Sequence, residues 1–227
     1  SVRIGLRLSK DETIVRTPFE VRHMGSKYPI FSFDFIGAKK GILPTSYDYL
    51  RLEGRMQYRL NLPPVGYSRL MLEGGKIFGK VPYLLLKLHE GNGTYFYDRY
   101  AFSCMNFYEF SSDAWISFFY EHHFNGFLLG RVPLLKKLNW REVFVFKGVY
   151  GTLSARNDGS LPNTKAVMLF PVGMSSVEHP YLETGFGIEN IFRLLRVDCI
   201  WRLTHHRAVP GLSIPTFTVN FSLNLKF

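Results

Sequence analysis

The sequence predicts an all-β fold, and more specifically an antiparallel transmembrane β-barrel, from three observations. Apolar and polar residues alternate in nine segments, a pattern typical of strands with one apolar and one polar face. Many of these segments run for about 10–12 residues, whereas a soluble strand usually has about 5–6 and a tilted membrane-crossing strand about 9–11. The connections between the segments also fall into a short and a long class.

The alternating segments are distributed along the whole chain. The first, "VRIGLRL" (2–8), separates four aliphatic side chains from two arginines and a glycine, and "YPIFSFDFIG" (28–37) places three phenylalanines opposite a serine and an aspartate. The last alternates without a break up to the terminal Phe227. The nine predicted strands are 2–8, 28–37, 49–60, 67–77, 112–124, 141–153, 180–190, 194–204 and 216–227.

The connections indicate which end of each strand faces which compartment. The connections 62–66 and 190–192 are tight, whereas 78–111 and 154–179 are long and rich in Gly, Asn and Pro. Outer-membrane barrels have short periplasmic turns and long external loops. If the last strand runs toward the periplasm, nine strands place both tight turns inside and both long loops outside. Two other periplasmic connections are longer than such turns usually are, 10–27 and 125–140.

The odd number of predicted strands implies that the barrel is incomplete. A closed antiparallel barrel normally has an even strand count, and an open edge cannot face lipid because its N–H and C=O groups would stay unpaired. We therefore expect residues 1–227 to be a single barrel region that forms the C-terminal part of a larger barrel. The start of the chain in an alternating segment fits a mature product or the later part of a longer protein.

Composition limits the class of protein. The chain is 46% hydrophobic and 16% aromatic, which excludes a disordered segment, and its net charge of +10 suggests anionic partners. Two cysteines, Cys104 and Cys199, can form at most one bridge, so the chain is not a disulfide scaffold. The longest apolar stretches are far shorter than the roughly 20 residues that a membrane helix needs.

The sequence gives little support for a catalytic, metal, cofactor or nucleic-acid site. His122 and His123 are adjacent on a predicted strand and point to opposite faces, so they cannot share a metal ion. The glycine-rich "GFGIEN" is followed by another strand rather than by the helix that a phosphate loop requires. No serine or cysteine has the surroundings of a nucleophile, and no RNA-binding motif is present.

The predicted inner face carries glycines and charged residues near the end of the chain. Gly185 and Gly187 leave room for a plug or loop to approach, and Glu183 and Glu189 share their face. These charges are either solvated and paired for structural reasons or take part in transport and gating. The neighbouring strand adds further charges to this face, Arg196, Asp198 and Arg202.

Three stretches resemble a known family. They are "EHHFNGFLLGRVPLLKKLNWREV", "YGTLS" and "PYLETGFGIENIFRLLRVDCIWRLT", and they look like the C-terminal region of a Bacteroidota outer-membrane family of unassigned function. Its full-length members resemble a carboxypeptidase-regulatory-like domain followed by a large β-barrel. The chain is more distantly similar to the sixteen-stranded BamA-like insertase superfamily, in which a glycine-bearing strand and an Arg-x-Asp strand precede the last strand. The matching residues are Gly185, Gly187, Arg196 and Asp198.

The insertase resemblance also implies a loop inside the barrel. In that superfamily the sixth external loop folds into the lumen and carries a Val-Arg-Gly-Phe/Tyr motif, whose counterpart lies in 78–111. Arg99 followed by Tyr100 is the nearest passage, without the Val-Arg-Gly, and we expect Arg99 to reach acidic residues of the inner face, of which Glu121 is one. The alternating C-terminus resembles the signal read by the barrel-assembly machinery. Its residues are Phe221, Leu223, Leu225 and Phe227.

Taken with the residues, the resemblance implies a non-enzymatic protein of the cell outer membrane that binds no cofactor. It would act in protein or lipid translocation or in envelope assembly, with a loop folded into the lumen. The expected partners are outer-membrane lipid and lipopolysaccharide, the assembly machinery and other outer-membrane proteins, and not nucleic acid. One alternative is a docking barrel that holds partner proteins and transports nothing. Another is a soluble β-barrel or sandwich, because alternation alone does not say which face meets lipid.

Overall fold

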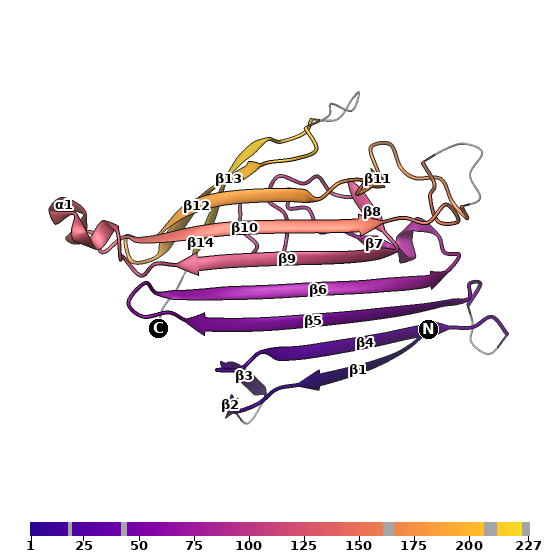
Figure 1. Ribbon diagram of the computed structural model, residues 1–227, viewed down its shortest axis with the longest axis horizontal. Helices are drawn as coiled ribbons and strands as arrows, with labels where there is room; N and C mark the ends of the chain where they lie inside the picture. Colours follow the sequence, from indigo (N-terminus) through magenta and orange to yellow (C-terminus); the bar gives the residue numbers. More distant parts are fainter. Residues whose placement is uncertain (18–19, 42–44, 161–165, 207–212, 224–227) are drawn as a thin grey trace.

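The central feature of the computed structural model is one nine-stranded antiparallel sheet (Figure 1). The structure describes residues 1–17, 20–41, 45–160, 166–206 and 213–223. Strands that follow one another in the sheet also follow one another along the chain, so the sheet is a meander. All nine predicted strands are confirmed. The strands are β1 (Val2–Leu8), β4 (Ile30–Ala38), β5 (Tyr49–Asn61), β6 (Tyr67–Gly79), β9 (Ala114–His123), β10 (Arg141–Thr152), β12 (Tyr181–Ile191), β13 (Leu195–Arg202) and β14 (Phe217–Leu223).

The two ends of this sheet differ. One end, at the left of Figure 1, carries the tight connections and the short helix α1 (Pro133–Lys136), and we call it the turn end. In the tight connection between β5 and β6, the amide of Leu62 donates to the carbonyl of Gly66 over 2.8 Å. Gly66 has φ +102°, and a Cβ there would lie 1.8 Å from the carbonyl oxygen of His123, so only glycine fits.

The amphipathic stretch "VPLLKKLNW" (132–140) predicts a helical turn, which α1 confirms, but the sequence did not reveal the other small elements inside the longer connections. The connection 10–27 forms a hairpin of β2 (Glu12–Arg16) and β3 (Val21–Ser26) instead of a simple turn, and 125–140 holds a 3₁₀ turn, η2 (Leu129–Arg131), before α1. At the opposite end, the loop end, parts of both long connections pair in a three-stranded sheet. Its strands are β7 (Lys87–Leu88), β8 (Phe110–Ser112) and β11 (Ser175–Ser176), and a 3₁₀ turn, η1 (Tyr83–Leu85), precedes β7.

The two faces of the large sheet have an inverted polarity. On one face, which we call the apolar face, large side chains such as Ile4 (65% exposed) and Phe186 (60% exposed) are uncovered within the described residues. The other, inner face carries charged side chains that are fully buried, among them Glu183 and Asp198. A water-soluble protein normally buries its large apolar side chains and exposes its charges. In this sheet one face exposes large apolar side chains, while the other buries charged side chains together with apolar ones.

Apolar packing occurs on the inner face, where the connection between β6 and β9 covers the sheet. Phe102 and Met105 from this connection pack with Phe119 of β9 and Tyr181 of β12. A second cluster lies toward the loop end and is made by Ile77, Val81, Leu86 and Trp115. The connection is therefore seated on the sheet by hydrophobic contacts as well as by polar ones.

The nine-stranded sheet does not close into a barrel within the described residues. Its two edge strands are β1 and β14. The edge of β14 is partly covered, because the amide of Tyr97 donates to the carbonyl of Phe221 over 2.8 Å and the amide of Phe221 donates to the carbonyl of Tyr95 over 2.7 Å. No helix in the described parts of the chain is both long and apolar enough to cross a membrane.

The small sheet at the loop end should loosen in acid. His89 is buried, its Nε2 lies 2.9 Å from Ser112 Oγ, and burial together with nearby Lys87 lowers the pKa of His89 to about 3. The unfolded segment has a histidine pKa of about 6.5, so this stabilisation is complete above pH 6.5 and decreases as the pH falls toward 3. We expect amide exchange in β7 and β8, corrected for its intrinsic rate, to accelerate over this interval.

The control for this expectation is His89→Gln. Glutamine can still bond to Ser112 but does not titrate, so exchange in this variant should not change between pH 7 and pH 4. An equal acid response in both proteins would show that another group is responsible.

Candidate functional site

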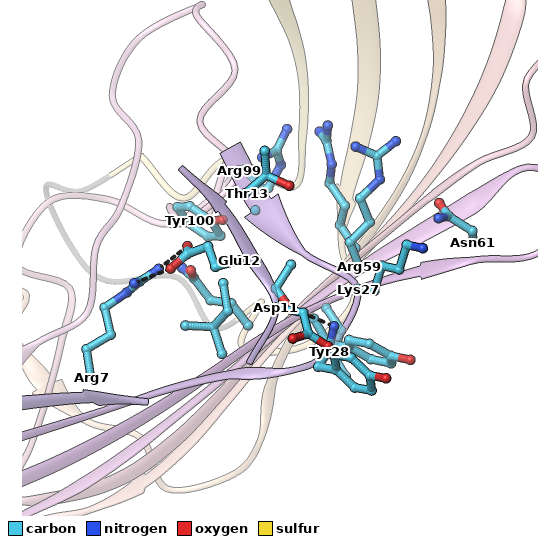
Figure 2. A pocket seen from close by; sticks show the side chains of 17 residues that line it. Arg7, Asp11, Glu12, Thr13, Lys27, Tyr28, Arg59, Asn61, Arg99 and Tyr100 are labelled. Carbon is cyan, nitrogen blue, oxygen red and sulfur yellow. Dashed lines mark hydrogen bonds and ion pairs between the residues drawn. The ribbon is translucent and has the colours of Figure 1, made fainter. Parts of the chain in front are cut away.

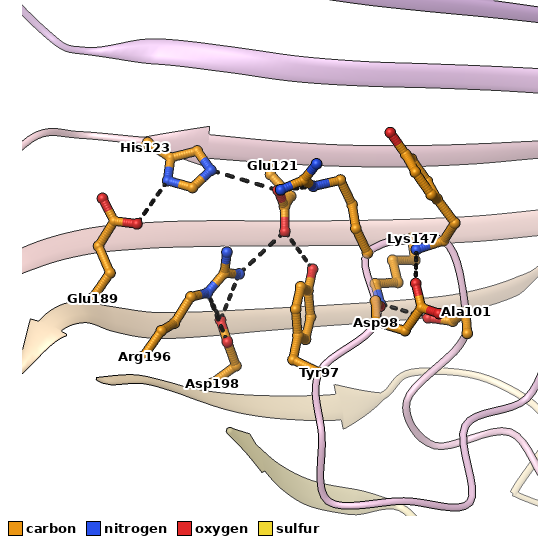
Figure 3. A network of polar contacts seen from close by, with 11 residues as sticks. Tyr97, Asp98, Ala101, Glu121, His123, Lys147, Glu189, Arg196 and Asp198 are labelled. Carbon is orange, nitrogen blue, oxygen red and sulfur yellow. Dashed lines mark hydrogen bonds and ion pairs between the residues drawn. The ribbon is translucent and has the colours of Figure 1, made fainter. Parts of the chain in front are cut away.

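Residues 80–113, between β6 and β9, form a loop that crosses the polar face of the large sheet, and we call it the inner loop. Its central contact is the buried carboxylate of Glu121 on β9 (Figure 3). Glu121 accepts hydrogen bonds from Tyr97 Oη (2.5 Å) and Arg99 Nε (2.6 Å) of the loop and from Arg196 Nη2 (3.2 Å) of β13. One carboxylate thus joins the loop to two strands.

Arg196 extends this network along β13. Its guanidinium donates from Nε to Asp198 Oδ2 over 2.7 Å and from Nη2 to Asp198 Oδ1 over 2.8 Å, and it lies 4.4 Å from the ring centroid of Tyr97. Two-point arginine–carboxylate bonding fixes both side chains in one orientation. Asp198 therefore fixes the guanidinium of Arg196, which in turn contacts both Tyr97 and Glu121.

A second set of contacts holds the backbone of the inner loop between two opposite charges. Glu183 of β12 accepts the amide N–H groups of Ser103 (2.8 Å) and Cys104 (2.7 Å). Lys147 of β10 donates from Nζ to the carbonyls of Asp98 (2.8 Å) and Ala101 (2.5 Å).

Lys147 and Glu183 are direct cross-strand partners, and both are buried. Each charge is satisfied by loop groups of the opposite polarity, so residues 98–104 are fixed through their main chain. Charge-assisted bonds of this kind are stronger than neutral ones.

Arg202 of β13 anchors the far part of the inner loop. It donates from Nη2 to Glu109 Oε1 over 2.6 Å and from Nη1 to the carbonyl of Cys104 over 3.2 Å. Its guanidinium carbon lies 4.8 Å from the ring centroid of Tyr181. Both members of the Arg202–Glu109 pair are buried, so losing either would leave an uncompensated charge.

A family model matches residues 1–155, and its description is "Family of unknown function (DUF5686) C-terminal domain". The chain belongs to this family. The match includes the inner loop together with Glu121 and Lys147, whereas Glu183, Arg196 and Arg202 lie beyond it. No curated protein matches the chain.

In this DUF5686 C-terminal domain, the sequence-derived site residues divide among several contacts. Arg99 forms an ion pair with Glu121, and Arg196 forms ion pairs with Asp198 and Glu121. Glu189 instead faces His123, whose Nδ1 is 3.2 Å from Glu189 Oε2. Tyr100 packs edge-on against Phe119, with ring centroids 6.3 Å apart.

The two glycines of β12 have a different role from the expected one. A Cβ on Gly187 would lie 2.2 Å from Asp198 Oδ1, and one on Gly185 would lie 2.7 Å from the carbonyl oxygen of Cys199. These nearest atoms belong to β13, so the close approach of the neighbouring strand is the first constraint on both glycines. Glycine is required because β13 approaches closely.

The remaining sequence-derived residues lie elsewhere. Phe221 and Leu223 are exposed on the apolar face of β14, and Leu225 and Phe227 lie outside the described residues. His122 contacts Ser68 on the apolar face, with His122 Nδ1 2.8 Å from Ser68 Oγ, whereas His123 faces the polar network. The described residues contain no group of three or more His, Cys, Asp or Glu side chains suited to a metal ion.

The sequence analysis did not identify Tyr97 or Glu109 as members of the network, and it did not predict that Lys147 binds the inner loop. Lys147 carried a signal, since it is a charged residue in the inner phase of a predicted strand. Tyr97 and Glu109 carried none, because the inner loop lacks a periodic pattern.

Burial raises the pKa of Tyr97 well above its usual range and that of Cys104 to about 12, so both keep their protons at neutral pH.

Glu183→Gln should release the middle of the inner loop. The amide side chain offers one neutral acceptor in place of the carboxylate, at a cost of about 1–3 kcal/mol. We expect the amide protons of Ser103 and Cys104 to exchange about 10–100-fold faster in hydrogen-exchange measurements. The matched control is Glu90→Gln in the same loop, which changes a half-exposed carboxylate that pairs with Lys87. Equal protection in the wild type and Glu183→Gln would mean that the backbone contacts of Glu183 contribute little.

Proposed function

We propose that this chain is the C-terminal part of an outer-membrane β-barrel of about sixteen strands, whose lumen is occupied by the inner loop. In this proposal the protein is not an enzyme and acts in protein or lipid translocation or in envelope assembly. The observation that carries the proposal is the inverted polarity of the sheet. A face of exposed Phe, Leu and Ile side chains backed by buried charges suits a wall between lipid and a polar lumen.

Strand length supports the same function. β5 and β6 each have 13 residues. At about 3.3 Å per residue and a tilt of about 45°, such a strand spans roughly 30 Å, which is enough for the lipid-facing band of about 25 Å. A soluble sheet seldom needs strands this long.

The open edges support a larger barrel. In lipid, the free edge N–H and C=O groups of β1 would each cost several kcal/mol, as would those of β14 that the inner loop does not cover. The proposed barrel therefore has additional strands that pair with them. A family description that reads "C-terminal domain" agrees with a longer protein. The resemblance to the Bacteroidota family and to the BamA-like superfamily supports a barrel of about sixteen strands, and the Arg99–Glu121 pair is the nearest counterpart of the insertase loop contact.

The expected partners follow from this placement. The apolar face would contact outer-membrane lipid and lipopolysaccharide, and the barrel-assembly machinery would insert the chain. Other outer-membrane proteins would complete a working complex.

A second function, a docking barrel without transport, is favoured by the firmness with which the inner loop is held. Glu121, Lys147, Glu183 and Arg202 all bind it, which suits a permanently closed lumen.

The membrane placement can be tested with one carboxylate on either face of β4. Phe33 is on the apolar face, whereas neighbouring Ser32 faces inward between Arg7 and Arg55. We expect Phe33→Glu to lower the free energy of unfolding in lipid vesicles by about 1–3 kcal/mol, because the charge enters hydrocarbon. Ser32→Glu, the matched control, should have little effect because its side chain points to the polar inner face and not to the apolar face. If both variants were tolerated equally, the apolar face would be in contact with water.

Deleting residues 92–108 separates transport from docking. If the inner loop closes the lumen of a transport barrel, the deletion should raise ion conductance in planar bilayers. The variant should also still migrate differently on a gel before and after heating, which would show that the barrel folds without these residues. The control is deletion of α1, which Figure 1 places beyond the end of the sheet and which should leave conductance unchanged. Unchanged conductance in both deletions would favour the docking function.

A further inference from the structure

A cavity of about 860 Å³ lies on the inner face at the turn end of the sheet (Figure 2). Its walls are the β2–β3 hairpin, the first residue of β4, the end of β5, the start of β6 and the loop residues Arg99 and Tyr100. A cavity of this size is in the range of small-molecule sites. It lies beside the Glu121 network: Arg99 belongs to both, and Arg69 of the cavity is the direct cross-strand partner of Glu121.

The cavity has an excess of positive charge. Two of its cations are neutralised, since Arg7 pairs with Glu12 and Arg99 pairs with Glu121. The other cations of the lining are Lys27, Arg59 and Arg69, and none of them forms an ion pair with any residue that the structure describes. The only other acid of the lining is Asp11, so three cations face one anion.

The two unpaired arginines are held in place by an aromatic stack. Arg59 and Arg69 are direct cross-strand partners on β5 and β6, and like charges in such positions repel. Both guanidinium groups lie against Tyr67, at 4.3 Å and 5.2 Å from its ring centroid, and the ring of Tyr67 stacks on His123 at 4.5 Å. Cation–π contact orients the guanidinium groups without neutralising them, which leaves their N–H donors free for an anion.

We propose that this cavity binds a phosphorylated saccharide, either free or as the headgroup of a lipid. A phosphate monoester carries a charge of about −1.5 to −2, which matches the surplus of two positive charges. Its oxygens accept two-point bonds from arginine, whereas one carboxylate would leave a cation unmatched. Tyr28, Asn61 and Thr13 in the same lining can donate to sugar hydroxyls. The site follows from the charges of the cavity, so it stands whether or not the barrel transports a substrate.

Calorimetric titration of the detergent-purified full chain tests the site. Glucose 6-phosphate is the free probe, lipid A in mixed micelles is the lipid-linked probe, and glucose and a hexaglutamate peptide are the comparisons. We expect glucose 6-phosphate to bind and glucose not to bind. Arg59→Gln and Arg69→Gln should each weaken the binding by about 10–100-fold.

Two further variants control for folding and for general charge. Lys27→Gln alters an exposed side chain outside the strands and should weaken binding without affecting the fold. Arg3→Gln removes an exposed arginine that pairs with Asp34 outside the cavity, and should leave binding unchanged.

The probes separate the sources of the ligand. Tighter binding of lipid A would identify a lipid headgroup, and tighter binding of glucose 6-phosphate a free sugar phosphate. The proposal is overturned if Lys27→Gln and both arginine variants bind like the wild type, or if hexaglutamate binds more tightly than both phosphorylated probes.

Discussion

The carboxylate of Glu121 and the charges around it require partners, and this requirement organises the inner face. A buried charge costs several kcal/mol unless it is paired and hydrogen-bonded, and the sheet alone cannot pair all of its charges. Tyr97 and Arg99 supply the missing donors to Glu121, and the loop backbone satisfies Lys147 and Glu183. The inner loop and the sheet are each incomplete without the other, which explains why a segment without regular structure over most of its length follows one path.

The same sheet meets two different environments. Its apolar face is uncovered by the described chain, whereas its inner face combines ion pairs with the packing of Phe102 and Met105. A period of two along each strand is sufficient to build such a wall, because successive side chains point to opposite faces. In the proposed barrel, this wall would enclose the inner loop, which main-chain and side-chain bonds hold against the sheet.

The charged side chains of the inner face are paired in one region of the sheet and unpaired in another. Around Glu121 nearly every cation has a carboxylate within bonding distance, so this region is a closed structural network. At the turn end, Arg59 and Arg69 are cross-strand partners that both lie against Tyr67, and neither forms an ion pair with a residue that the structure describes. The region around Glu121, in which charges are paired, suits the anchoring of the inner loop. The region at the turn end, which has surplus positive charge and a cavity, suits the binding of a ligand.

The sequence by itself determined the nine strands and the faces of their side chains, because alternation is a local pattern in which successive side chains point to opposite faces of a strand. It did not predict the β2–β3 hairpin, the small sheet at the loop end or Tyr97 on Glu121. It placed Gly187 beside a loop, whereas the structure places it against Asp198. Only the tertiary structure decided these contacts, because they join residues far apart in the chain and depend on the path of a loop that has no periodic pattern.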